Sequence, residues 1–193
     1  MWSTISSTAS FDTTALSDGD VDVRATVTDN EGNSAQDSGT VTVDNTAPTV
    51  TADNIPTSDV TGSVDVTSWF TITDDDGGTT TYEYSTDGGS SWSTISSPTS
   101  FDTTALDDGD VKIRATDTDD AGNQDQATGT VTVDNTQPSA SADSIPTSDV
   151  NGLVDVTGWF TVSTDGGSTT YEYSTDGGST WSTISSPGSF DTT

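Results

Sequence analysis

The chain repeats itself at an interval of about 90 residues, and this repeat constrains its fold more than any other feature. The segment WSTISS occurs at residues 2–7, 92–97 and 181–186, so its copies begin 90 and 89 residues apart. VDNTAP at residues 43–48 returns as VDNTQP at 133–138. Self-similarity at a fixed interval is typical of a tandem array, in which each repeat is one structural unit. We therefore expect consecutive copies of one small fold.

Alternating hydrophobic residues predict that this fold is built of short β-strands. Hydrophobic and polar side chains alternate at residues 111–116, and the same two-residue period recurs at 82–84 and 131–133. Successive side chains of a strand point to opposite faces, so this period indicates half-buried strands. Turns are expected at the DGG, DDGD, AGN and NTAP segments. An all-β repeat of about 90 residues has the size of an immunoglobulin-like β-sandwich.

We expect the complete repeat at residues 47–136, between two VDNT junctions. Residues 1–46 are then the C-terminal half of one repeat, and residues 137–193 are the N-terminal part of a further one. A second division stays open, in which each unit runs from one WSTISS segment to the next. Strands are expected at 49–52, 64–73, 80–85, 92–101, 111–118 and 129–134. The expected core is Trp69 or Phe70, with Tyr82, Tyr84, Trp92, Ile95, Phe101, Leu106, Val111, Ile113, Val131 and Val133.

Neither terminal piece is expected to bury a complete core alone. We expect residues 137–193 to pair with residues 1–46 of another copy, which gives a head-to-tail chain or a closed ring. Both pieces carry a version of WSTISSxxSFDTT, at 2–14 and 181–193. Only one version can occupy that strand position in a composite sandwich, so the other must detach or swap.

Charge and composition exclude several classes of function. The net charge of −29 comes from 32 acidic residues against Arg24, Lys112 and Arg114, which disfavours nucleic acids and anionic membranes as partners. Histidine is absent, which removes the serine-histidine triad and most catalytic zinc sites. Cysteine is absent too, so no disulfide holds the repeats. Repeats of this size leave little room for a cleft, so we do not expect an enzyme.

Two segments carry a family resemblance. They are LDDGDVKIRATDTDDAGNQDQATGTVTVDNTQP at residues 106–138 and LSDGDVDVRATVTDNEGNSAQDSGTVTVDNTAP at 16–48. Both resemble the second half of the bacterial immunoglobulin-like repeats of giant calcium-dependent surface adhesins, with a DG pair, a D-x-x-G-N turn and a VD-x-T-x-P junction. The resemblance implies a secreted extender region that separates a membrane anchor from an adhesive tip at the cell surface. It also implies calcium between neighbouring repeats.

Strand direction gives a separate argument for calcium. In a sandwich with the expected strands, the loop before strand 111–118 lies at the downstream end of the unit, and the loops after strands 64–73 and 111–118 lie at the upstream end. Stacked units then bring acids together, and calcium takes six to eight oxygen ligands. At the first junction we expect Asp18, Asp20, Asp44 and Asn45 against Asp74, Asp75, Asp119 and Asp120. At the second we expect Asp108, Asp110, Asp134 and Asn135 against Asp165.

Other interpretations of the same residues stay open. The acids can form a solvated coat, as in a high-salt protein. An EF-hand is disfavoured, because the loop that begins at Asp117 has Thr128 where glutamate is required. A carbohydrate-binding adhesive module would expose Trp2, Trp92 or Trp181 to sugar rings. Ice binding would need regular threonine ladders, and a glycosidase would need paired carboxylates in a cleft.

Overall fold

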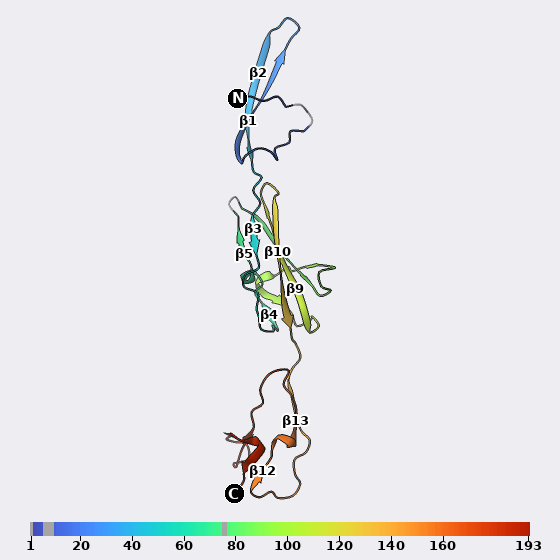
Figure 1. The fold of residues 1–193 in the computed structure, drawn as a ribbon, viewed down its shortest axis with the longest axis vertical. Coiled ribbons are helices and arrows are strands. Elements are labelled where there is room, and N and C mark those ends of the chain that lie inside the picture. Colours follow the sequence, from blue (N-terminus) through green and yellow to red (C-terminus); the bar gives the residue numbers. More distant parts are fainter. Residues whose placement is uncertain (1, 6–9, 75–76) are drawn as a thin grey trace. The chain divides into compact units, whose positions relative to one another are not determined.

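The computed structural model describes residues 2–5, 10–74 and 77–193. Within these ranges the regular structure consists of β-strands and three-residue 3-10 helices (Figure 1). The chain divides into two compact units, Met1–Asn135 and Thr136–Thr193. The all-β fold class that the alternating pattern predicts is therefore confirmed. None of these short helices has the length or the hydropathy of a membrane-spanning segment.

Unit 1 begins with a long antiparallel hairpin. Its strands are β1 (Gly19–Thr28) and β2 (Ser34–Val43), paired from Gly19 opposite Val43 to Thr28 opposite Ser34. In the described part of the chain each of these strands pairs only with the other. The second edge of β1 is consequently free of ladder hydrogen bonds there.

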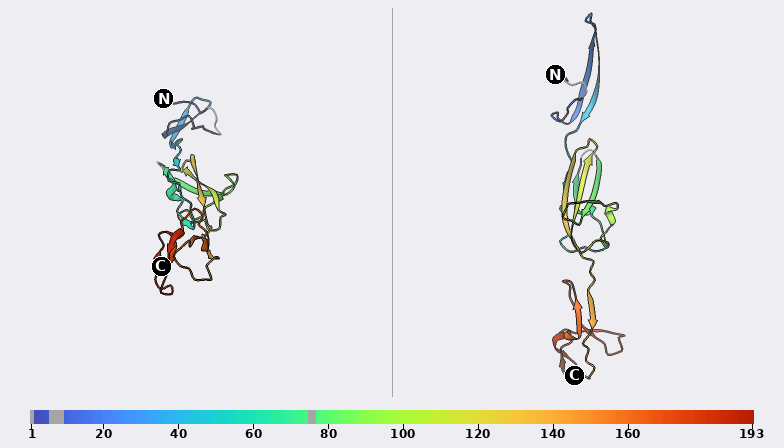
Figure 2. Two further views of the ribbon diagram at one scale, coloured as in Figure 1. Left: turned by 60° about the horizontal axis from the view of Figure 1, so that its bottom comes forward. Right: turned by 90° about the vertical axis from the view of Figure 1, so that its right-hand side faces the viewer.

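The rest of unit 1 is a two-layer sandwich, seen from two further directions in Figure 2. One layer is a four-stranded sheet in the order β10-β9-β6-β7, and the other contains the pairs β3-β5 and β4-β8. The elements are β3 (Thr49–Thr51), β4 (Ser63–Val64), η1 (Thr67–Trp69), β5 (Thr71–Thr73), β6 (Gly78–Ser85), β7 (Ser93–Thr94), η2 (Pro98–Ser100), β8 (Phe101–Asp102), β9 (Gly109–Asp119) and β10 (Gln124–Val133).

The segment after β3 ties the two layers together. Val60 forms a parallel bridge with Val133 of β10, with hydrogen bonds from Val60 N to Thr132 O (2.9 Å) and from Asp134 N to Val60 O (3.0 Å). A first strand that pairs with one sheet and then runs beside the last strand of the other is an immunoglobulin-like arrangement. The predicted sandwich is thus confirmed.

Two of the expected strands are interrupted. The predicted strand 64–73 is β4 and β5 separated by η1, where Asp65 Oδ1 accepts hydrogen bonds from Thr67 N (3.0 Å) and Thr67 Oγ1 (2.6 Å). The predicted strand 92–101 is β7 and β8 separated by η2, whose first residue is Pro98. Proline fixes φ near −65° and removes a ladder donor, so an uninterrupted strand is disfavoured there. The last strand, expected at 129–134, begins earlier, at Gln124.

The core lies between the two layers of this sandwich. Trp69 and Phe70 are both buried, whereas only one of them was expected, because the turn of η1 lets consecutive side chains reach the same side. Tyr82, Tyr84, Phe101 and Leu106 pack against the core while partly exposed. Its buried members are Val50, Val66, Trp69, Phe70, Ile95, Val111, Ile113, Ala115, Val131 and Val133.

The prediction that Trp92 belongs to the core is wrong. Its ring stacks on the guanidinium of Arg114, with Arg114 Cζ 4.1 Å from the ring centroid. Arg114 also donates hydrogen bonds to Glu83 Oε2, one of them from Nε at 3.0 Å. Arg114 lies on the face of β9 opposite to the buried Ile113 and Ala115, because side chains alternate along a strand. Trp92 therefore covers the outer face of the sheet.

Unit 2 repeats the first part of the sandwich. Its strand pairs are β11-β13, β12-β16 and β14-β15, in the order of β3-β5, β4-β8 and β6-β7. Several hydrophobic side chains whose counterparts in unit 1 pack in or against the core are exposed here, Phe160, Val162 and Tyr173 among them. The elements are β11 (Ser139–Ala142), β12 (Leu153–Val154), η3 (Thr157–Trp159), β13 (Phe160–Ser163), β14 (Glu172–Tyr173), β15 (Ser182–Thr183), η4 (Pro187–Ser189) and β16 (Phe190–Asp191).

Candidate junction site

The turn between β9 and β10 is closed by one carboxylate. Asp119 Oδ1 accepts hydrogen bonds from Gly122 N and Asn123 N, both at 2.7 Å, and Asp119 Oδ2 accepts one from Asn123 Nδ2 at 2.8 Å. Asp119 N donates to Asn123 O at 3.1 Å. Aspartate side chains commonly organise turns in this way, by bonding to backbone groups a few residues on. The result is a rigid D-x-x-G-N turn with the Asn123 amide at its end.

Asn123 connects this turn to the residues that follow β2. Its Nδ2 lies 3.3 Å from both Asp44 O and Thr46 O. These carbonyls belong to the VDNTAP segment, which joins the hairpin to the sandwich within unit 1. Strand direction predicts Asp119 and Asp44 on facing sides of one junction, and the amide of Asn123 bridges their two segments.

Asp44 has an unusual carboxylate. Its Oδ1 accepts a hydrogen bond from Thr46 N at 3.0 Å. Its Oδ2 is buried and lacks a hydrogen-bond partner in the described part of the chain. A buried carboxylate oxygen without a donor is costly, so it calls for a water molecule or a cation.

Two other predicted ligands, Asp18 and Asp108, accept hydrogen bonds from the junction segments beside them. Asp18 Oδ1 accepts from Asn45 N at 2.7 Å, and Asp18 Oδ2 accepts from the Thr46 hydroxyl. In the next repeat Asp108 Oδ1 accepts from Asn135 N at 2.6 Å. These contacts place the loop before β1 or β9 beside the segment after β2 or β10, at the downstream end that the topology requires.

The two asparagines of these junction segments act through their amides. Asn45 Nδ2 donates to Thr13 O and Leu16 O, both at 3.0 Å. Asn135 Nδ2 makes the equivalent bonds to Thr103 O (2.9 Å) and Leu106 O (3.0 Å). Their nitrogens thus fix the preceding loop, while Asn135 Oδ1 accepts from Thr61 Oγ1 at 2.9 Å.

The remaining candidates are dispersed. Asp20 accepts from Thr42 Oγ1 at 3.0 Å, and Asp110 accepts from Thr132 Oγ1 at 3.4 Å, so each bonds to the residue opposite it in the β1-β2 or β9-β10 pair. Asp120 is exposed, and Asp165 has a positive φ of 45°. Asp74 and Asp134 are partly buried, and Asp75 lies outside the described residues. Among the described residues, no group of three or more acids is close enough together to hold a metal ion.

Hydrogen bonds control the ionisation of the turn carboxylate. Burial raises the pKa of Asp119, but the bonds from Asn123 and Gly122 outweigh burial, and its net pKa lies below the ordinary value of 3.8. The pKa of Asp18 is also lowered, first by the Thr46 hydroxyl and then by Asn45 N. A carboxylate with a lowered folded-state pKa stabilises the fold above its unfolded pKa. This contribution is lost as the pH falls through the folded-state pKa.

Asn123→Ala is expected to raise the pKa of Asp119. The variant removes the Nδ2 donor while burial remains, so the balance shifts toward the neutral acid. The measurement is a pH titration of the Asp119 carboxyl carbon by NMR, from pH 2 to 7. Asn33→Ala is the matched control in the hairpin turn, where Asn33 Nδ2 donates to the Asp29 carboxylate at 2.8 Å and lowers its pKa. An unchanged titration of Asp119 would contradict the assignment.

Asn123 is absent from the set of ligands predicted from the sequence. The signal that could have found it is the recurrence of GN at residues 32–33 and 122–123, which sequence reasoning used only as a turn marker. Its contact with the junction depends on the distance between the turn and residues 44–46, and only the folded chain provides that distance.

Neither a protein-family model nor a curated protein sequence matches the chain. One solved structure that is similar to it is the crystal structure of a tetra-tandem repeat in the extending region of a large adhesion protein. The two sequences are 22% identical, and the TM-score is 0.33. The match covers 91% of this chain and 48% of that one, so the chain spans about half the length of the structure it matches.

Proposed function

We propose that the chain is an extender segment of a secreted surface adhesin, with residues 47–136 as its complete repeat. In this proposal calcium stiffens the junctions between repeats, and the incomplete repeats of neighbouring chains complete one another. The role is structural and not catalytic. It is the role named for the tetra-tandem repeat structure, and here it is proposed from the chain's own repeats and junctions.

The observation that carries the proposal is the hydrogen bonding at the first junction. Asn123 of the sandwich holds the backbone of residues 44–46, and Asp18 holds the same segment from the hairpin side. A linker fixed from both sides transmits orientation from one repeat to the next, whereas a free linker of the same length would behave as a flexible coil. This is what a spacer requires.

Calcium fits one of the candidate residues well. The Asp44 Oδ2 atom is buried and has no donor among the described residues, and an anionic oxygen in that position suits a hard cation. Asp119 already has donors on both oxygens, so it would serve calcium only by exchanging them. Asp44 would therefore hold the ion, with the candidates of the Asp74 loop, Asp75 included, as further carboxylates. The ion would supply positive charge between acids that otherwise repel.

Calcium is expected to raise the melting temperature of the chain by about 5–10 °C over the value in excess EDTA. The rise should not be matched by magnesium, which prefers smaller octahedral sites and keeps its water. Asp44→Asn should abolish the rise. In EDTA this variant should be as stable as the wild type or more so, because it removes the charge of a carboxylate whose Oδ2 atom is buried. Thermal unfolding in moderate salt measures all of these.

Asp107→Asn is the matched control, because it removes the same charge from an exposed position in the loop before β9. It should keep the full effect of calcium. If stability instead follows only ionic strength, the acids are a solvated coat. If a soluble glycan stabilises the chain and calcium does not, a carbohydrate-binding module replaces the spacer.

A further inference from the structure

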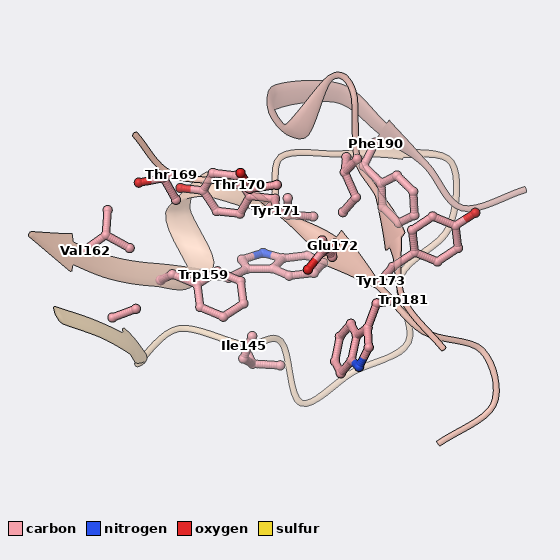
Figure 3. Close-up of a pocket in the computed structure, with 14 residues that line it drawn as sticks. Ile145, Trp159, Val162, Thr169, Thr170, Tyr171, Glu172, Tyr173, Trp181 and Phe190 are labelled. Carbon is pink, nitrogen blue, oxygen red and sulfur yellow. The ribbon is translucent and has the colours of Figure 1, made fainter. Parts of the chain in front are cut away.

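Unit 2 has an open hydrophobic groove of about 520 Å³, which Figure 3 shows with the side chains that line it. Trp159, Tyr171, Tyr173 and Phe190 form much of its wall. Tyr173 is 40% exposed, and Val162, which also lines the groove, is 37% exposed. Exposed hydrophobic surface of this kind marks a place where another element packs.

The sandwich of unit 1 identifies that element. The counterparts of Trp159 and Tyr171 are Trp69 and Tyr82, and both pack in the core together with residues of β9 and β10. Ile113 of β9 is 1% exposed there. What covers this surface in unit 1 is therefore a hairpin of the β9-β10 type.

The β1-β2 hairpin has the sequence of such a cover. Val21, Val23 and Ala25 stand where β9 has Val111, Ile113 and Ala115, and Val41 and Val43 stand where β10 has Val131 and Val133. The hydrophobic side chains of β1 are only partly buried or exposed, as is Val41. The edge of β1 that corresponds to the β6 side of β9 pairs with no other strand in the described part of the chain.

We propose that the β1-β2 hairpin of a second copy docks in this groove, with β1 alongside β14. The register follows from the β6-β9 pair, in which Tyr82, Glu83 and Tyr84 face Ala115, Arg114 and Ile113. In the composite sandwich Tyr171, Glu172 and Tyr173 then face Ala25, Arg24 and Val23 of the second copy. This inference rests on the pairing of incomplete repeats in the proposed function, and it specifies the partner strand and the register.

The positions of one isoleucine and one glycine support this register. In unit 1 the side chain of Ile55 lies so close to Gly129 of β10 that an added Cβ would be 2.2 Å from Ile55 Cδ1. The counterparts are Ile145, which lines the groove and is 48% exposed, and Gly39 of β2, where an added Cβ meets none of the described residues within 4 Å. The groove offers the isoleucine, and the hairpin offers the open glycine.

Charge favours the same register and reveals a competitor. Arg24 would meet Glu172 as Arg114 meets Glu83. It would also meet Trp181, the counterpart of Trp92. At present Trp2 occupies this stacking position, with Arg24 Cζ 4.0 Å from its ring centroid. Trp2 therefore has to move away from Arg24 before Trp181 of the copy that carries the groove can stack on it.

The test uses the 193-residue chain at about 0.15 M salt, where the repulsion between chains of charge −29 is screened. Light scattering should give a mass that rises with concentration above the 19.8 kDa of one chain. Gly39→Val fills the space on the hairpin that Ile145 would occupy, without a clash inside the hairpin. Ile145→Asp places a charge in the groove, so that the groove no longer accepts a hairpin. Each variant alone should associate about 10- to 100-fold more weakly.

The mixture of these two variants is decisive. The Gly39→Val chain keeps a working groove and the Ile145→Asp chain keeps a working hairpin, so an equimolar mixture should form a one-to-one dimer and nothing larger. Val27→Asp is the control on β1, because the equivalent residue of β9 is Asp117, and it should keep association. Trp2→Ala should strengthen association about threefold by freeing Arg24.

A charge exchange tests the register by itself. Arg24→Glu and Glu172→Arg should each weaken association, and the chain with both changes should recover it. Appending residues 105–136 after Thr193, the counterpart of Thr104, should fill the groove within the chain and abolish association. A wild-type chain that stays at 19.8 kDa up to about 1 mM would overturn the docking. Association without recovery in the double variant would overturn the register, and neither result alters the calcium test of the spacer.

Discussion

Ile113→Ala should lower the free energy of unfolding of the unit 1 sandwich by about 2–5 kcal/mol. Ile113 lies in the middle of β9 and is 1% exposed, in contact with a core that has few alternative side chains to fill a cavity. A domain of this size has a total stability of about 5–15 kcal/mol, so the loss is a large fraction of it. Urea unfolding followed through the NMR signals of the β9 and β10 amides measures the loss in the sandwich alone.

The repeat supplies a matched pair that isolates burial from local sequence. Val131→Ala and Val41→Ala make the same change at equivalent positions of β10 and β2, where the valines are 3% and 43% exposed. The first should cost at least about 1 kcal/mol and the second less than about 0.5 kcal/mol, measured at a concentration where chains do not associate. Equal losses would mean that the hairpin packs as the sandwich does.

Gly129→Val should also have a large effect and lower the free energy of unfolding of the sandwich by about 1–3 kcal/mol or more. A Cβ at residue 129 would lie 2.2 and 2.4 Å from the last two atoms of the Ile55 side chain, which packs against the core. Ile55 has to leave its position, and the hydrophobic surface beneath it becomes exposed. The same urea titration measures this loss.

Gly39→Val is the control, because in the part of the chain that the structure describes a Cβ there meets no atom within 4 Å. Its unfolding free energy should equal that of the wild type or exceed it slightly, since valine favours strands more than glycine does. Preservation of full stability in Gly129→Val would show that Ile55 repacks without cost. That outcome would also weaken the argument for Ile145 and Gly39 in the docked hairpin.

The calcium candidates separate what strand order determines from what local hydrogen bonding determines. Topology indicated which acids lie at the ends of the strands, and Asp18, Asp108 and Asp119 do lie beside junction segments or turns. Their oxygens accept bonds from nearby amides and hydroxyls, which a chain rich in threonine, serine and asparagine supplies everywhere. Whether a carboxylate is already satisfied depends on backbone angles that the spacing of residues does not contain.

The sequence alone determined the β-sandwich, because a two-residue hydrophobic period is a local property that each strand carries with it. It also placed the turns, since glycine, asparagine and aspartate set backbone angles locally. Only the tertiary structure decided that Trp92 lies outside the core on Arg114, that Asn123 reaches residues 44–46, and that Asp44 Oδ2 is buried with no donor among the described residues. Each of these depends on which segments, far apart in the chain, lie next to one another, and that information appears only when the layers pack.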